Sequence, residues 1–159
     1  MTGEAKNRGM MVRSVIVMCA IIKRVAMDGV VGMTEFFMPM KPPTTTAQQH
    51  KVTGSHFYDP PEVKAARVKL EAHLAKHIPV SPYIEPVELV TTWCFPVTGK
   101  HKNGEYKYTR PDTDNLQKLL KDCMTECGYW KDDALVCREI IEKFWADQPG
   151  IYIRIKELV

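Results

Sequence analysis

The stretch Arg110-Pro-Asp-Thr-Asp-Asn-Leu-Gln-Lys-Leu-Leu-Lys-Asp122 decides how the C-terminal half of the chain folds. Asp112 and Asp114 stand where a helix is expected to begin, because the free N–H groups and positive dipole end of a helix start favour negative charge. Leucines follow at helical spacing, and Gly128 is a natural residue to come after the helix end. The stretch therefore predicts a helix that starts near 112–114, stops before Gly128 and carries two carboxylates at its beginning.

The rest of the chain predicts an α/β fold with a mixed sheet, in the order β-α-β-α-β-β. Strands are expected at 34–40, 88–95, 135–145 and 151–156, and another helix at 59–78, capped by Asp59. The third strand alternates imperfectly, which indicates a bulge. The intervals 41–56 and 98–109 are expected to be loops, the second of them mobile and basic.

The charge of the chain is unevenly distributed. The sequence has 22 Lys and Arg against 19 Asp and Glu, and residues 1–32 hold five of the basic and two of the acidic side chains. Residues 33–159 therefore carry 17 of each sign and are formally neutral, so any nucleic-acid surface there must be a local patch. We expect an N-terminal extension, 1–32, outside the fold and one domain, 33–159, long enough for a real core.

Two further features bear on the compartment. The five cysteines have no framework spacing, which favours a reduced cytoplasmic protein over a disulfide scaffold. The apolar run 12–22 resembles a signal-peptide core, but it is too short to span a bilayer as a helix and no small-residue cleavage site follows it. We expect Met33 to be the natural start and no association with a membrane.

A second acidic pair, Asp132-Asp133, follows the second helix. Each pair has a simple structural explanation, since one acid can cap a helix and an Asp-Asp turn is common. A cap needs one acid, however, and Asp112 and Asp114 supply two. Carboxylates repel one another, so a site that gathers three or four of them usually holds a divalent cation. Lys118, one turn after Asp114, could form a surface ion pair or place a cation beside a metal-bound phosphate.

The combined pattern resembles one family. It comprises the run Arg110-Pro-Asp-Thr-Asp-Asn-Leu-Gln-Lys118, the turn Gly128-Tyr-Trp-Lys-Asp-Asp133 and the hairpin Pro149-Gly150. These segments resemble the RusA family of Holliday junction resolvases, most closely over 110–155 and more loosely back to the first strand. The resemblance implies a small mixed α/β homodimer with two active sites, one for each opposed strand of a four-way DNA junction.

The resemblance also implies the site. It assigns the three metal-binding carboxylates to Asp112, Asp114 and Asp133. Lys118 matches an essential lysine and completes the catalytic set, while Asp132 is expected to support Asp133 or replace it as a ligand. The implied cofactor is Mg²⁺, with Mn²⁺ as a substitute, because hard carboxylate oxygens suit these ions; no small-molecule cofactor is implied. The implied reaction is phosphodiester hydrolysis in branched DNA during recombination and repair. The resemblance also allows a phage or prophage protein that acts on host-cell DNA.

Five basic residues are predicted to bind DNA phosphates. They are Lys100, Lys102, Lys107, Arg110 and, on the helix, Lys118. Interleaved tyrosines could stack on bases, although a solvated loop is the alternative, and the neutral domain departs from the basic surface expected of a junction binder. Two other functions stay open: a metal-dependent phosphohydrolase acting on other branched DNA or nucleotides, and a catalytically inactive nucleic-acid-binding dimer.

Overall fold

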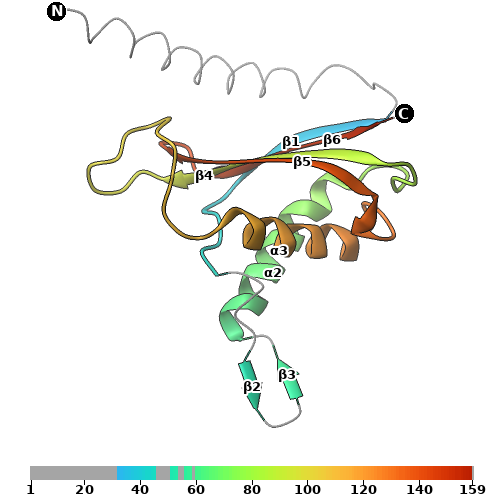
Figure 1. Ribbon diagram of the computed structural model, residues 1–159, viewed down its shortest axis with the longest axis horizontal. Coiled ribbons are helices and arrows are strands. Elements are labelled where there is room, and N and C mark those ends of the chain that lie inside the picture. The colour runs from blue at the N-terminus through green and yellow to red at the C-terminus, as the bar shows by residue number, and fades with distance from the viewer. Residues whose placement is uncertain (1–31, 46–50, 54–55, 59, 159) are drawn as a thin grey trace, which may run out of the picture.

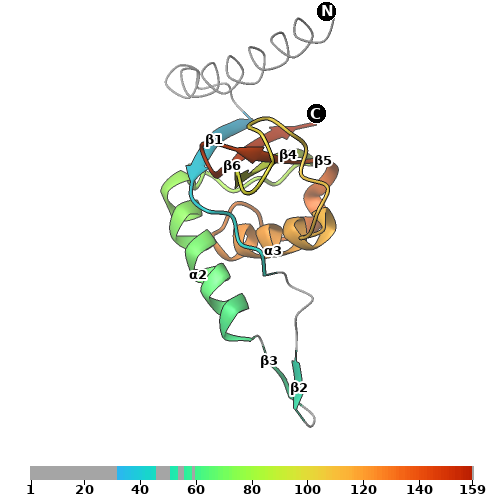
Figure 2. The same ribbon diagram turned by 90° about the vertical axis from the view of Figure 1, so that its left-hand side faces the viewer.

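A four-stranded mixed sheet with both helices on one face forms the body of the protein (Figures 1 and 2). The computed structural model describes residues 32–45, 51–53, 56–58 and 60–158. The strands are β1 (Met33–Pro39), β4 (Val87–Pro96), β5 (Val136–Ala146) and β6 (Gly150–Glu157), and the helices are α2 (Pro61–Leu74) and α3 (Thr113–Glu126). The sheet order is β1-β6-β4-β5, with β5 parallel to β4 and the other pairs antiparallel. The predicted fold class and element order are confirmed.

One predicted loop contains additional structure. The interval 41–56 was expected to be a loop throughout, but β2 (Lys51–Thr53) pairs with β3 (His56–Tyr58) in an antiparallel hairpin. Figure 1 shows this hairpin extending away from the sheet beyond the start of α2. The cap expected at Asp59 and the extension expected over 1–32, apart from Gly32, lie outside the described residues.

The first helix is shorter than the sequence pattern predicted. It ends at Leu74 and continues as a 3₁₀ turn, η1 (Ala75–His77), rather than reaching Ile78. Ile78 has an extended backbone, with φ −59° and ψ 129°, because a residue that precedes a proline is disfavoured in the helical region. The Ile78 side chain is 45% exposed, so the helix ends before this residue.

Strand β4 is the centre of the core. Leu89, Thr91 and Trp93 are fully buried on the face that α2 and α3 cover, and α3 adds a stripe of equally buried side chains. Those side chains are Leu116, Leu119, Leu120, Cys123 and Met124. The predicted bulge in the third strand is also confirmed, because the β4–β5 register skips one residue at Cys137.

The cysteines in the described residues, Cys94, Cys123, Cys127 and Cys137, are all free. Burial raises the pKa of the Cys94 thiol to about 11 and that of the Cys123 thiol to about 12, so both pack as small apolar residues rather than as nucleophiles. Among the described residues, no helix has the length and apolarity needed to cross a bilayer.

Candidate active site

Asp112 and Asp114 lie at the start of α3, as the sequence predicted. Asp112 is the residue before the helix, with φ −76° and ψ 150°, and its side chain makes no capping hydrogen bond. Among the described residues, neither carboxylate has a hydrogen-bond or ion-pair partner. Capping, the simple structural explanation for these acids, therefore does not account for Asp112, and both carboxylates are available to a ligand.

Lys118 is likewise exposed and, within the described residues, without a partner. Its neighbour Lys121 differs: the Lys121 ammonium lies 2.6 Å from the carboxylate of Glu139 on β5. The surface ion pair between Asp114 and Lys118 that the sequence allowed is not formed. The predicted catalytic lysine thus keeps its charge free, whereas the lysine one turn further along the helix is bound to the protein.

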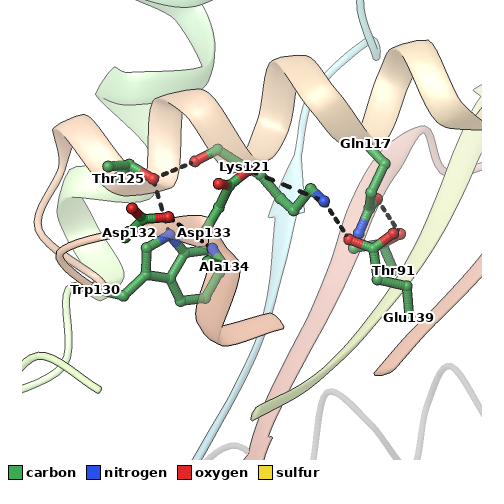
Figure 3. A network of polar contacts seen from close by, with 9 residues as sticks. All are labelled: Thr91, Gln117, Lys121, Thr125, Trp130, Asp132, Asp133, Ala134 and Glu139. Carbon is green, nitrogen blue, oxygen red and sulfur yellow. Dashed lines mark hydrogen bonds and ion pairs between the residues drawn. The ribbon is translucent and has the colours of Figure 1, made fainter. Parts of the chain in front are cut away.

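Gly128 determines where the second acidic pair lies. Its φ of 84° turns the chain at the end of α3. The N–H groups of Gly128 and Tyr129 donate to carbonyls of the last helical turn, both at 3.0 Å, which is the pattern of a Schellman motif. The Trp130 indole N–H then donates to the Thr125 hydroxyl at 2.9 Å (Figure 3). The chain therefore returns alongside α3 and carries Asp132-Asp133 back beside the helix.

The two acids of this turn make different contacts. Asp132 accepts a hydrogen bond from the Ala134 N–H at 2.8 Å and caps the short 3₁₀ turn η2 (Asp133–Leu135). The Asp133 carboxylate instead lies 4.0 Å from the Lys121 ammonium. Figure 3 shows Lys121 reaching from α3 between Asp133 and Glu139. Asp132 is explained by the turn, and Asp133 is the member of the pair that faces the helix.

The three candidate carboxylates do not converge in this structure. Lys121, the neighbour of Asp133, comes two turns after Asp114, a rise of about 10 Å along the helix. In the described part of the chain, no three His, Cys, Asp or Glu side chains are close enough together to hold an ion. The donor set still fits a divalent cation chemically, because Asp112 and Asp114 have unused hard oxygens. A shared ion would require Asp133 to leave Lys121.

A buried polar network that the sequence did not predict lies beneath α3. The Trp93 indole N–H donates to the Thr91 hydroxyl at 3.2 Å, and that hydroxyl donates to Oε1 of Gln117 at 2.9 Å (Figure 3). Because an indole N–H can only donate, the chain of bonds has one direction and fixes the orientation of the Gln117 amide. Its Nε2 is buried and finds no partner within the described part of the chain. A glutamine within the apolar stripe of α3 was the available signal.

The basic segment 98–109 is anchored to β5, whereas the sequence predicted a mobile loop. The Gly104 N–H donates to the Trp145 carbonyl at 2.8 Å, and the Lys107 N–H donates to the Lys143 carbonyl at 2.9 Å. The Lys107 side chain is only 7% exposed, and its ammonium lies 4.6 Å from the centroid of the Trp145 ring. Lys107 is therefore enclosed by protein, and its expected contact with DNA is corrected.

The other predicted DNA-binding side chains face solvent. Lys100, Lys102 and Arg110 are exposed, and the two tyrosines between them are 60% (Tyr106) and 81% (Tyr108) exposed. Exposed cations and aromatic rings therefore precede the carboxylates directly in the chain.

The fold and this site define a small α/β protein with unpaired carboxylates at the start of a helix, and comparison with known proteins gives its family. Residues 39–156 match the family described as endodeoxyribonuclease RusA. The chain is 32% identical over 123 residues to the crossover junction endodeoxyribonuclease rusA of Lactococcus phage r1t, covering 74% of this chain and 92% of that protein. It is also 25% identical over 114 residues to the uncharacterized protein YqaN of Bacillus subtilis (strain 168), covering 65% and 80% of the two chains.

This chain belongs to the RusA family of endodeoxyribonucleases, which are hydrolases. Nucleases of this family are metal-dependent, and the family acts on branched DNA. The resemblance drawn from residues 110–155 is thereby confirmed at the level of the family.

Proposed function

We propose that this protein is a Mg²⁺-dependent endonuclease that resolves four-way DNA junctions by hydrolysing phosphodiester bonds. The observation that carries the proposal is that Asp112, Asp114 and Lys118 are free of partners among the described residues, while the backbone that bears them is anchored. Elsewhere around α3, charged side chains such as Lys121 and Glu139 are bound to one another. Side chains left unpaired on a fixed backbone are what an active site needs.

The proposed roles follow from the chemistry of each group. Asp112 and Asp114 would hold the ion through carboxylate oxygens, and Asp133 would join them by leaving Lys121. When bound, Mg²⁺ (or Mn²⁺ as a substitute) supplies charge neutralisation at the scissile phosphate and a more acidic attacking water. Lys118 would place its ammonium beside the phosphate oxygens as negative charge develops on them.

The exposed basic residues would bind the DNA backbone. Lys100, Lys102 and Arg110 would contact phosphates, and Tyr106 and Tyr108 would stack on bases unpaired near the branch point. Lys107 is left out, because its ammonium is bound within the protein. These contacts form the local patch that a formally neutral domain requires.

We further propose a homodimer that acts on DNA in the cytoplasm. Two opposed strands of a junction must be cut for resolution, and one protomer has one such carboxylate set. A two-fold dimer would present two sites related by the symmetry of the junction itself.

The experiment is cleavage of an end-labelled mobile four-way junction with Mg²⁺, with Mn²⁺ and with EDTA. We expect symmetric nicks in opposed strands that require the metal, and loss of cleavage with retained junction binding in Asp112→Asn and Asp114→Asn. Asp147→Asn is the matched control, because Asp147 is an exposed aspartate outside α3. Cleavage by Asp112→Asn at the wild-type rate would overturn the site. Activity confined to flaps or nucleotides would favour a different phosphohydrolase, and metal-independent binding without cleavage would favour an inactive binding module.

A further inference from the structure

Two lysine ammonium groups converge on the backbone directly ahead of Asp112. The segment 109–111 has three consecutive carbonyls. Lys143 donates to the first and third of them, at 2.9 and 2.7 Å. Lys107 donates to the first at 3.3 Å and also to the second. All three carbonyls of the segment therefore have an ammonium donor.

This arrangement is an unusual way to satisfy a short connecting segment. Carbonyls outside helices and strands need a donor, but at an exposed position water can provide one. Here two like charges share the Thr109 carbonyl. Burial against Trp145 and then the charge of Lys143 lower the pKa of Lys107. Keeping two cations together at one place opposes folding, and their hydrogen bonds to the three carbonyls offset this cost and fix the backbone at 109–111.

The need for a defined backbone follows from the freedom of the carboxylates. Asp112 and Asp114 have no side-chain partner among the described residues, so nothing but their own backbone orients them. The segment 109–111 sets where that backbone enters α3. We propose that Lys107 and Lys143 are positioning residues, which fix 109–111 and thereby hold Asp112 and Asp114 in place to bind the metal. This inference rests on the proposed function.

Strand β5 would then support both halves of the candidate site. Lys143 and Glu139 are four residues apart on β5, and they pair with Trp93 and Leu89 of β4, residues on its buried face. Lys143 holds the segment before α3, while Glu139 binds Lys121, the neighbour of Asp133. Residues of one edge strand thus bind both the backbone ahead of Asp112 and the lysine beside Asp133.

Lys143→Met is the test variant, because methionine keeps an unbranched apolar side chain close to the lysine stem in size and removes the donors. Binding of Mn²⁺ is measured by electron paramagnetic resonance, junction binding by gel shift in EDTA, and cleavage in single turnover. We expect Mn²⁺ affinity to fall by about tenfold or more, as when groups that orient metal ligands are removed. Metal-free junction affinity should change by less than about twofold, because Lys143 already donates to two protein carbonyls. Hydrogen exchange at 109–114 should rise.

Lys143→Arg and Lys156→Met complete the design. Arginine retains donors for carbonyls, so it should recover most of the Mn²⁺ affinity, whereas Lys156 is an exposed lysine on β6 whose loss should change neither binding nor cleavage. If Lys143→Met does not fold, Lys107→Met replaces it under the same criteria, since it removes the other ammonium that donates to the Thr109 and Arg110 carbonyls.

Unchanged Mn²⁺ affinity in the folded variant overturns the inference, whatever happens to cleavage. Weaker junction binding with unchanged Mn²⁺ affinity also overturns it, because Lys143 would then be a DNA contact. The proposed function fails separately: wild-type protein that binds no Mn²⁺, or whose Mn²⁺ binding survives in Asp112→Asn, removes the metal site itself. Wild-type binding that Asp112→Asn abolishes and Lys143→Met leaves intact removes only the positioning role.

Discussion

The ammonium of Lys121 lies 2.6 Å from the carboxylate of Glu139, an ion pair that joins the middle of α3 to the edge strand β5. The same ammonium is 4.0 Å from Asp133. A protein cation therefore lies beside the carboxylate that the family resemblance assigns to the metal. Lys121 and a metal ion would compete for Asp133.

Lys121→Met should strengthen Mn²⁺ binding while weakening the fold. Loss of a partly exposed ion pair should lower the free energy of unfolding by about 1 kcal/mol or less, and freeing Asp133 from its competitor should raise Mn²⁺ affinity by at most about fivefold. Calorimetric Mn²⁺ titration and urea unfolding measure the two effects. A decrease in Mn²⁺ affinity would show that Lys121 holds Asp133 ready rather than competing for it.

Gly128→Ala should destabilise the protein and impair the site together. A left-handed backbone opposes any side chain by about 1–2 kcal/mol. Among the described residues, only Gly128 and its two chain neighbours have atoms within 4 Å of an added Cβ, so strain rather than a clash causes the loss. Any relaxation of φ would move Asp133, which lowers Mn²⁺ affinity. Gly99→Ala is the matched control, because Gly99 also has positive φ and open space. It should show the stability loss with Mn²⁺ affinity intact; equal loss of affinity in both variants would contradict the assignment.

Thr91→Val should destabilise the fold more than the similar shapes of threonine and valine suggest. Valine leaves the Gln117 Oε1 and the Trp93 Nε1 buried without their partner, and two such groups should lower the free energy of unfolding by about 2–4 kcal/mol. Thr91→Ser keeps the hydroxyl and should lose only about 1 kcal/mol for the missing methyl. Urea unfolding of both variants checks the order, and a serine variant as unstable as the valine variant would contradict the network.

Glu88→Gln should reduce stability at neutral pH but not in acid. A hydrogen bond from Arg138 at 3.1 Å, reinforced by Arg154, holds the pKa of Glu88 below its ordinary value of 4.5. A carboxyl whose pKa is lower in the folded state stabilises the fold above its unfolded value, and this is lost as the pH falls through the folded value. The difference in the free energy of unfolding between wild type and Glu88→Gln should therefore be present near neutrality. It should shrink as the pH falls below 4.5 and disappear below the folded pKa of Glu88. A difference that does not vary with pH would show that Glu88 acts through packing alone.

Local sequence was sufficient for the elements that depend on short-range chemistry. Leucines at helical spacing and the glycine after them defined α3, and the alternation of β6 is reproduced by the complete burial of Ile151, Ile153 and Ile155. The register skip at Cys137 also followed from pattern alone. Errors arose where a neighbour overrode the pattern, as Pro79 did for Ile78.

The sequence by itself determined which groups could carry out chemistry, because spacing within a helix start and a turn is a local property. It placed Asp112 directly before one helix and Asp114 and Lys118 within it, and it indicated the family. Only the tertiary structure decided which charges are free and which are bound. Pairing of 104–107 with β5 encloses Lys107, and the contact between α3 and β5 brings Lys121 into an ion pair with Glu139. Such contacts join residues far apart in the chain, so their partners depend on strand order and register, which residue spacing does not encode.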